Sequence, residues 1–164
     1  MTDPKEILER IKDSEHQKIK IAVVDIDGIL RGKVIRKDKF LSAAKTGFGF
    51  CDVIFGWDSA DESYDNSKFT GWHTGYPDAE AQIDLSTFRN VPWDGNIPFF
   101  LADFSGNKGN ASDICPRSLL RKIRDRASGM CYGALFSQEF EWFNYKEDPA
   151  SITEKGFADL QPLT

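Results

Sequence analysis

The chain has 164 residues, of which 40% are hydrophobic and 13% aromatic, a composition that favours one folded domain or slightly more over a disordered chain. Aspartate and glutamate (26) outnumber lysine and arginine (21), and the net charge of -5 argues against a nucleic-acid partner. The three cysteines and two histidines form no familiar zinc-ligand spacing, and the odd, sparse cysteine count fits a reducing cytosol.

The first part of the sequence predicts a small α+β sheet. Pro4 can open a helix, and a later alternating and then continuously apolar run is typical of a strand that becomes buried. Asp27-Gly28 predicts a tight turn into a second strand, and Gly47 predicts the end of the helix that follows. In chain order, the predicted elements are a helix at 4–14, strands at 18–25 and 29–36, and a helix at 37–46.

The middle and last parts of the sequence alternate between loops and regular elements. Residues 56–77 show no sustained period but contain aromatic, acidic and glycine residues, which favours a functional loop. In the predicted helix, Leu119, Leu120 and Ile123 are expected to face inward and most of the basic side chains to face solvent. The predicted elements are strands at 79–85 and 97–104, a turn at 92–95, a polar loop at 105–114, a helix at 116–128, a strand at 131–145 and a tail at 148–164 without an obvious core partner.

Glu139 and Glu141 form an acidic pair inside the strand-like run GALFSQEFEWFNY. Alternate residues of a strand share one face, so the two carboxylates are expected about 7 Å apart on the same face. Such a pair repels unless a cation lies before it, and Mg²⁺ or Mn²⁺ prefers oxygen donors of this kind. The alternative from spacing alone is the solvated acidic face of an amphipathic strand.

Asp25 and Asp27, in the run VVDIDGIL, resemble the nucleophile motif of haloacid-dehalogenase-like phosphatases. The competing interpretation is a hairpin in which Asp27-Gly28 makes the turn, and it is favoured because RGKVIRK begins another strand at once. The later segment SGNKGN (105–110) has glycines and a lysine but not the spacing of a phosphate-binding loop, so a turn is predicted there.

The order of several short segments resembles the amino-terminal part of the glutamine synthetase family. These segments are Asp27-Gly28 with Arg31-Gly32-Lys33, Gly47-Phe48-Gly49-Phe50, Asp58, Asp84-Leu85-Ser86-Thr87, Pro92-Trp93, Pro116-Arg117 and Glu139-Phe140-Glu141. The resemblance implies a β-grasp-like domain at 1–110, followed at 111–164 by the incomplete start of a catalytic domain built on an antiparallel sheet.

The resemblance also implies a reaction, in which ATP phosphorylates the γ-carboxylate of glutamate and ammonia or an amine displaces the phosphate. By this resemblance, Glu139 serves the metal on the nucleotide side and Glu141 the metal on the amino-acid side. Asp58 matches the loop aspartate that reaches into a neighbouring subunit's site, where it holds and deprotonates the ammonium or amine. Asp78 matches a further acidic, substrate-binding position, and the expected assembly is a ring-shaped homo-oligomer with active sites between subunits.

Departures from the family pattern leave the acceptor and the activity open. Asp58 is followed by Ser-Ala-Asp where the family has Gly-Ser-Ser, so a ligase for a polyamine or another amine is nearly as well supported as a glutamine synthetase. The family's remaining metal and substrate ligands lie further along a longer chain, so this chain alone is expected to be inactive. The alternative is a non-catalytic assembly or regulatory relative. The charged N-terminus and the lack of a long apolar run predict a cytoplasmic protein without membrane segments.

Overall fold

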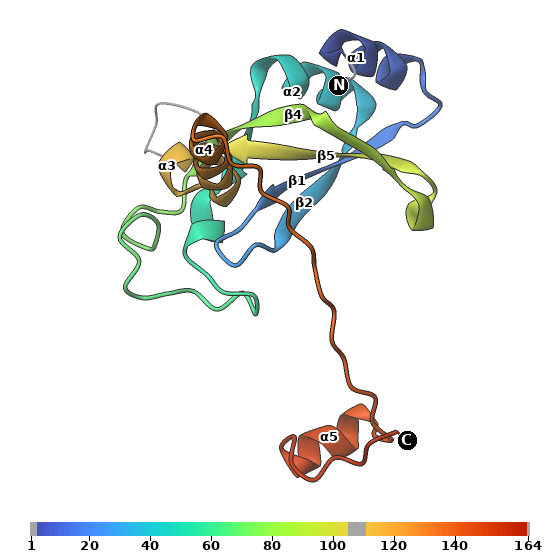
Figure 1. Cartoon of the computed structure of the whole chain (residues 1–164), viewed down its shortest axis with the longest axis vertical. Helices are drawn as coiled ribbons and strands as arrows, with labels where there is room; N and C mark the ends of the chain where they lie inside the picture. The colour runs from blue at the N-terminus through green and yellow to red at the C-terminus, as the bar shows by residue number, and fades with distance from the viewer. Residues whose placement is uncertain (1–2, 105–110, 164) are drawn as a thin grey trace. The chain divides into compact units, whose positions relative to one another are not determined.

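The computed structural model describes residues 3–104 and 111–163, which fall into two compact units, Met1–Tyr132 and Gly133–Thr164. The first unit is built on a five-stranded sheet with the strand order β2-β1-β5-β4-β3 (Figure 1). Its elements are α1 (Pro4–Asp13), β1 (Lys18–Val24), β2 (Leu30–Arg36), α2 (Lys37–Thr46), β3 (Phe48–Cys51), η1 (Asp52–Phe55), β4 (Asp78–Val91), η2 (Pro92–Asp94), β5 (Ile97–Phe104), α3 (Ala111–Ile114) and α4 (Pro116–Gly129).

The sheet is mixed, which confirms the predicted α+β class. Strand β1 pairs with β2 in antiparallel and with β5 in parallel orientation, while β4 is antiparallel to both β5 and β3. The β1–β2 pair is the predicted hairpin, with Val24 opposite Leu30 at its end. Gly28 in the turn has φ of +83°, a backbone conformation that glycine adopts without steric cost.

Helices α1 and α2 cover one face of this sheet (Figure 1). Ile7 and Ile11 of α1 and Phe40 of α2 are buried there against Ile21 of β1 and Phe100 of β5. Ile7 and Ile11 lie one helical turn apart and therefore share the inward side of α1, and each such side chain stabilises the fold by about 1.5–3 kcal/mol through burial. The first helix begins as its sequence suggested, because the Asp3 carboxylate caps it by accepting a hydrogen bond from the Lys5 amide at 2.9 Å.

Strand β4 is longer than the predicted strand at 79–85 because it continues through a bulge after Asp84. The Asp84 carboxylate accepts hydrogen bonds from the amide of Ser86 at 3.1 Å and from its hydroxyl at 2.5 Å. The Thr87 hydroxyl accepts a hydrogen bond from the Leu101 amide at 2.8 Å, so a side chain replaces a backbone partner where the register shifts. The segment Asp84–Thr87 therefore builds the irregularity of the sheet.

Helix α4 has nearly the predicted length, but the predicted inward face is wrong. Leu119, Leu120 and Ile123 are each more than half exposed among the described residues. The helix instead meets the sheet through Arg117, whose Nη2 lies 2.7 Å from Asp84 Oδ2 and whose Nε lies 2.7 Å from Asp103 Oδ1.

Arg121, one turn further along α4, also pairs with Asp103. Asp84 and Asp103 alternate with core residues along β4 and β5, so they leave the sheet on the face opposite to α1 and α2. Ion pairing rather than apolar burial thus sets which side of α4 faces the sheet. Part of the predicted polar loop is also helical, at α3, while the predicted turn at 105–110 lies outside the described residues.

The second unit contains α5 (Pro149–Lys155), where the sequence predicted only a tail. The Asp148 carboxylate and the Ser151 side chain cap this helix reciprocally. The predicted strand at 131–145 is wrong: residues 132–144 form no strand, and a single bridge joins Tyr145 to Pro162. An extended segment becomes a strand only when another backbone pairs with it along its length, and among the described residues the backbone contact begins only at Asn144, whose carbonyl accepts from the Leu163 amide at 2.8 Å. No described helix is long and apolar enough to cross a bilayer.

Candidate functional site

The predicted functional loop contains a small ordered lobe at 56–64, next to the β1–β2 turn (Figure 1). Trp57 bridges to Ser63 in antiparallel fashion, and the Tyr64 amide donates to the Gly56 carbonyl at 2.7 Å. Between these contacts, the Asp58 amide donates to the carbonyl of Glu62 at 3.1 Å. These bonds close the lobe on itself, and we call residues 56–64 the Asp58 lobe.

The two carboxylate oxygens of Asp58 have different surroundings. Oδ1 accepts hydrogen bonds from the amides of Ala60, at 2.8 Å, and Glu62, at 3.0 Å. This is the arrangement by which an aspartate side chain organises a turn in its own backbone. Oδ2 accepts no hydrogen bond from any described residue. The half-buried Asp58 therefore shapes its lobe with one oxygen and has the other available for a ligand.

Arg31, in strand β2, connects the Asp58 lobe to the hairpin turn. Its Nε donates to Asp25 Oδ2 at 2.7 Å, and its Nη1 donates to Asp61 Oδ1 at 2.6 Å. Its Nη2 donates to the Asp58 carbonyl at 3.3 Å, and the guanidinium carbon lies 5.0 Å from the centre of the Trp57 ring. The hydrogen bond with Asp25 raises the pKa of Arg31 above its ordinary value, so the guanidinium stays charged.

The structure supports the hairpin interpretation of Asp25 and Asp27 over the phosphatase motif. Asp25 is fully buried, and its Oδ1 accepts from the amides of Asp27, at 3.0 Å, and Ile29, at 2.8 Å. Because Arg31 occupies Oδ2, both oxygens of Asp25 are used within the turn. A nucleophile must reach its substrate, and this carboxylate reaches only its own hairpin.

The surroundings of Asp58 are negative. Burial, and then the charges of three nearby aspartates, raise the pKa of the Tyr64 phenol above its ordinary value. Those aspartates are Asp27, Asp58 and Asp25. Several carboxylates around a free oxygen favour a cationic ligand over an anionic one.

Asp78 lies apart from this lobe, at the first position of β4 and opposite Cys51 of β3. Its carboxylate packs over Gly49, where an added Cβ would come within 2.6 Å of Oδ2. It borders a cavity of about 410 Å³ together with the buried Asp52, whose carboxylate accepts from the Thr70 hydroxyl at 2.5 Å. Burial, more than the charge of Asp78, raises the pKa of Asp52 above its ordinary value.

Glu139 and Glu141 lie in the second unit, on the extended and exposed segment 133–144. Carboxylates are the right donors for Mg²⁺ or Mn²⁺, so the chemistry of the pair fits such an ion. Two donors are only part of a coordination shell. Within residues 3–104 and 111–163, no three histidine, cysteine or acidic side chains are grouped closely enough to hold a metal.

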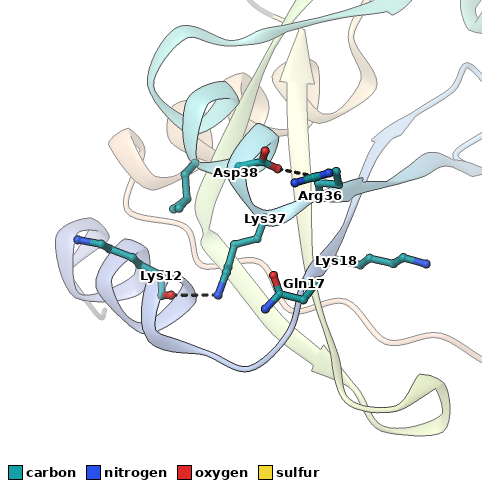
Figure 2. Close-up of a pocket in the computed structure, with 7 residues that line it drawn as sticks. Lys12, Gln17, Lys18, Arg36, Lys37 and Asp38 are labelled. Atoms are coloured by element: carbon teal, nitrogen blue, oxygen red, sulfur yellow. Dashed lines mark hydrogen bonds and ion pairs between the residues drawn. The ribbon is translucent and has the colours of Figure 1, made fainter.

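A cavity of about 550 Å³ lies between α1 and the start of α2, away from the Asp58 lobe. Figure 2 shows Lys37 reaching towards α1, where its Nζ donates to the Lys12 carbonyl at 3.1 Å. The same Nζ also donates to the Ser14 carbonyl at 2.7 Å. Arg36 at the border of the cavity pairs with Asp38 at 3.1 Å. Lys37 therefore satisfies carbonyls at the end of α1, and Arg36 pairs with a surface carboxylate, so both cations already have partners within the fold.

The sequence pattern predicts a role for Asp58 but does not predict the residues that hold its lobe. Arg31 and Asp61 are 30 positions apart, and no local pattern predicts their contact. The signal that could have found Arg31 is its place at the start of a strand that follows a buried aspartate turn. The same holds for Arg117 and Asp84, which occur in separate family-like segments and meet only in the folded chain.

No family model matches the chain, but individual proteins do. It is 52% identical over 158 residues to "Type-1 glutamine synthetase 2" of Dictyostelium discoideum, covering 96% of this chain and 30% of that protein. It is 37% identical over 146 residues to "Glutamate--isopropylamine ligase" of Pseudomonas, covering 88% and 32%. The chain thus spans about a third of the length of these relatives.

Solved structures show the same fold at low sequence identity. The chain of a "GmaS/ADP complex" superposes with a TM-score of 0.55 at 21% identity, covering 79% of this chain and 26% of that one. A glutamine synthetase of Plasmodium falciparum superposes with a TM-score of 0.56 at 20% identity, covering 79% and 23%. The observed mixed sheet with its helices is therefore a fold that such proteins contain over about a quarter of their length.

Proposed function

We propose a function from the premise that this chain belongs to the glutamine synthetase family. The chain is proposed to be part of an ATP-dependent ligase that joins ammonia or an amine to the γ-carboxylate of glutamate. The observation that carries the proposal is the similarity, over nearly the whole chain, to a protein named as a glutamine synthetase and to one named as a glutamate–isopropylamine ligase. The fold and the acidic Asp58 lobe are in keeping with it.

Asp58 is the residue proposed to act on the nitrogen nucleophile. An ammonium or alkylammonium ion must bind and then lose a proton before its lone pair can displace phosphate from an acyl phosphate. A carboxylate oxygen that accepts no hydrogen bond from any residue the structure describes, in negative surroundings, suits both steps. The general-base step would use Oδ2, since Oδ1 is already bonded to the lobe.

Glu139 and Glu141 are proposed as metal ligands, Glu139 on the nucleotide side and Glu141 on the amino-acid side. Mg²⁺ or Mn²⁺ bound there would neutralise charge on ATP and on the incoming carboxylate. The other donors must come from residues beyond those that the structure describes.

Asp78 is proposed as a substrate-binding residue. We also propose a ring-shaped homo-oligomer in which Asp58 serves a neighbouring subunit's site.

The proposed nitrogen acceptor is ammonia or an amine, and the proposal does not select between them. The names of the relatives include an isopropylamine ligase and a γ-glutamylethanolamide synthetase, so their nitrogen nucleophiles differ. The residues after Asp58 also differ from the Gly-Ser-Ser of the family pattern. An assay with several acceptors is needed to decide between them.

The test is ADP release by the full-length protein that contains this chain, supplied with glutamate, ATP and Mg²⁺ and then with ammonium or one of a panel of amines. The variant is Asp58→Asn, which keeps an oxygen for the amides of Ala60 and Glu62 but removes the charge and the base. We expect acceptor-dependent turnover to fall by about 10²–10⁴-fold.

The matched control is Glu62→Gln, which removes a charge from an exposed side chain of the same lobe. It should leave turnover within about twofold of the wild type, because surface substitutions of this kind are usually close to neutral. Turnover of Asp58→Asn near the wild-type value would refute the role of Asp58. A wild-type protein inactive with every acceptor would favour the non-catalytic relative.

A further inference from the structure

We propose that Arg31 is a positioning residue, which holds the Asp58 lobe in the geometry that the ligase reaction needs; this rests on the proposed function. Its guanidinium makes three hydrogen bonds, to the Asp25 carboxylate, the Asp61 carboxylate and the Asp58 carbonyl. The side chain therefore joins a buried carboxylate of the sheet to the backbone of the proposed catalytic residue. It touches neither Asp58 Oδ1 nor Oδ2, so its effect on the reaction is indirect.

The inner end of this connection is fixed. Asp25 is fully buried, and two backbone amides of the hairpin turn hold its Oδ1. Its Oδ2 accepts from Arg31 Nε at 2.7 Å. A buried carboxylate that has three donors, one of them a cation, has little freedom to move. The Arg31 guanidinium is thus bonded to a carboxylate that is itself fixed in the hairpin turn.

At the other end of the side chain, the Arg31 guanidinium holds the Asp58 lobe at two points, the Asp58 carbonyl and the Asp61 carboxylate. The carbonyl of Asp58 accepts from Arg31 Nη2 at 3.3 Å and from the Asp61 amide at 3.1 Å. The Asp61 carboxylate accepts from Nη1, and Asp61 has φ of +65°, a conformation that costs energy in a residue with a side chain. Trp57 covers the guanidinium from its ring face. An arginine fork fits these divergent acceptors, whereas a lysine has one point charge.

The consequence is a fixed direction for Asp58 Oδ2. Oδ1 is bonded to the lobe's own amides, and Arg31 fixes the lobe to the sheet, so the remaining oxygen keeps one position relative to the strands. Loss of Arg31 would leave the lobe closed but free to tilt as a body. A displacement of about 1 Å at a reacting group can cost about 10²-fold in rate.

The test uses the full-length protein with Arg31→Lys as the main variant, because a cation remains beside buried Asp25 and the chain is expected to fold. A lysine cannot contact Asp25, Asp61 and the Asp58 carbonyl together. We expect kcat with the preferred acceptor to fall by about 10- to 100-fold while KM for ATP and glutamate stays within about twofold. Arg36→Lys is the control, since Arg36 lies exposed on the same strand and, within the described part of the chain, forms an ion pair with Asp38 alone.

Two further readouts separate positioning from a general structural effect. In Arg31→Lys, amide hydrogen exchange should accelerate in residues 57–63 and stay unchanged in the helices α1 and α2. The double variant Arg31→Lys with Asp58→Asn should be no slower than Asp58→Asn alone, because Arg31 acts through Asp58. Additive losses in the double variant, or unchanged exchange in the lobe, would overturn the proposal. If Asp58→Asn is fully active, the proposed function fails, and the exchange measurement still decides whether Arg31 holds the lobe.

Discussion

The docking of α4 on the sheet gives the sharpest test of the fold. Arg117→Met would keep the aliphatic part of the side chain but remove the cation that lies 2.7 Å from both Asp84 and Asp103. The Asp84 side chain is only 21% exposed and the Asp103 side chain only 13% exposed. Each carboxylate would therefore lose a cationic partner at a position with little access to water. Exposed pairs contribute about 0–1 kcal/mol and breaking a fully buried pair costs about 3–5 kcal/mol. Since Arg121 remains beside Asp103, we expect an intermediate loss of about 2 kcal/mol.

The assay is native-state hydrogen exchange of the α4 amides, which reports the free energy of opening this helix. The matched control is Arg124→Met on the same helix, where a 66% exposed arginine pairs with its neighbour Asp125. The control should change the opening free energy by less than about 0.5 kcal/mol. Equal effects of the two substitutions would refute the conclusion that ion pairs, rather than apolar burial, orient α4. So would an Arg117→Met protein whose α4 amides keep wild-type protection.

Three further outcomes are expected. The hydrogen bond from Lys155, with those from Gln161 and Ser151, lowers the pKa of Glu147 to about 2. The stability that the ionised Glu147 gives α5 is therefore fully present above the ordinary glutamate pKa and is lost as pH falls towards 2. An NMR pH titration of α5 checks this, and the control Glu147→Gln should lack the pH dependence. Glu141→Ala in the full-length protein should abolish amine-dependent ADP release, and near-normal turnover would exclude Glu141 as a metal ligand. Phe40→Ala should cost about 3–5 kcal/mol in urea unfolding because Phe40 is fully buried, whereas Phe157→Ala, at a 77% exposed position, should be close to neutral.

The β1–β2 hairpin could be predicted because its signals are local. An apolar run, an Asp-Gly turn and a second extended run follow one another directly, and each favours the same structure. The buried positions of α1 and α2 could also be predicted, since Ile7 and Ile11 lie one turn apart in α1, and Phe40 lies at helical spacing from Ala44 in α2. The fold class followed from these elements, and the segment order supplied the family resemblance.

Features that depend on distant partners could not be predicted in this way. The run containing Glu139 and Glu141 has the alternation of a strand, but a pattern supplies no second backbone to pair with, and residues 132–144 form no strand. The sequence pattern predicts that the strand ends at 85, whereas β4 continues to Val91. The strand continues because the Thr87 hydroxyl replaces a backbone partner within the bulge, and local periodicity does not reveal this contact. The apolar residues of α4 suggested an inward face that two aspartates on other strands override.

Position 58 shows how one residue can meet a structural and a chemical requirement together. The lobe needs a short acceptor that reaches the amides of Ala60 and Glu62, and either aspartate or asparagine supplies one. The proposed reaction needs a charged oxygen that remains free, and of these two residues only aspartate supplies it. A glutamate would carry the charge, but its extra methylene moves the oxygens away from the turn amides. Under the proposed function, aspartate alone among the acidic and amide side chains satisfies both, provided that Arg31 keeps the lobe fixed to the sheet.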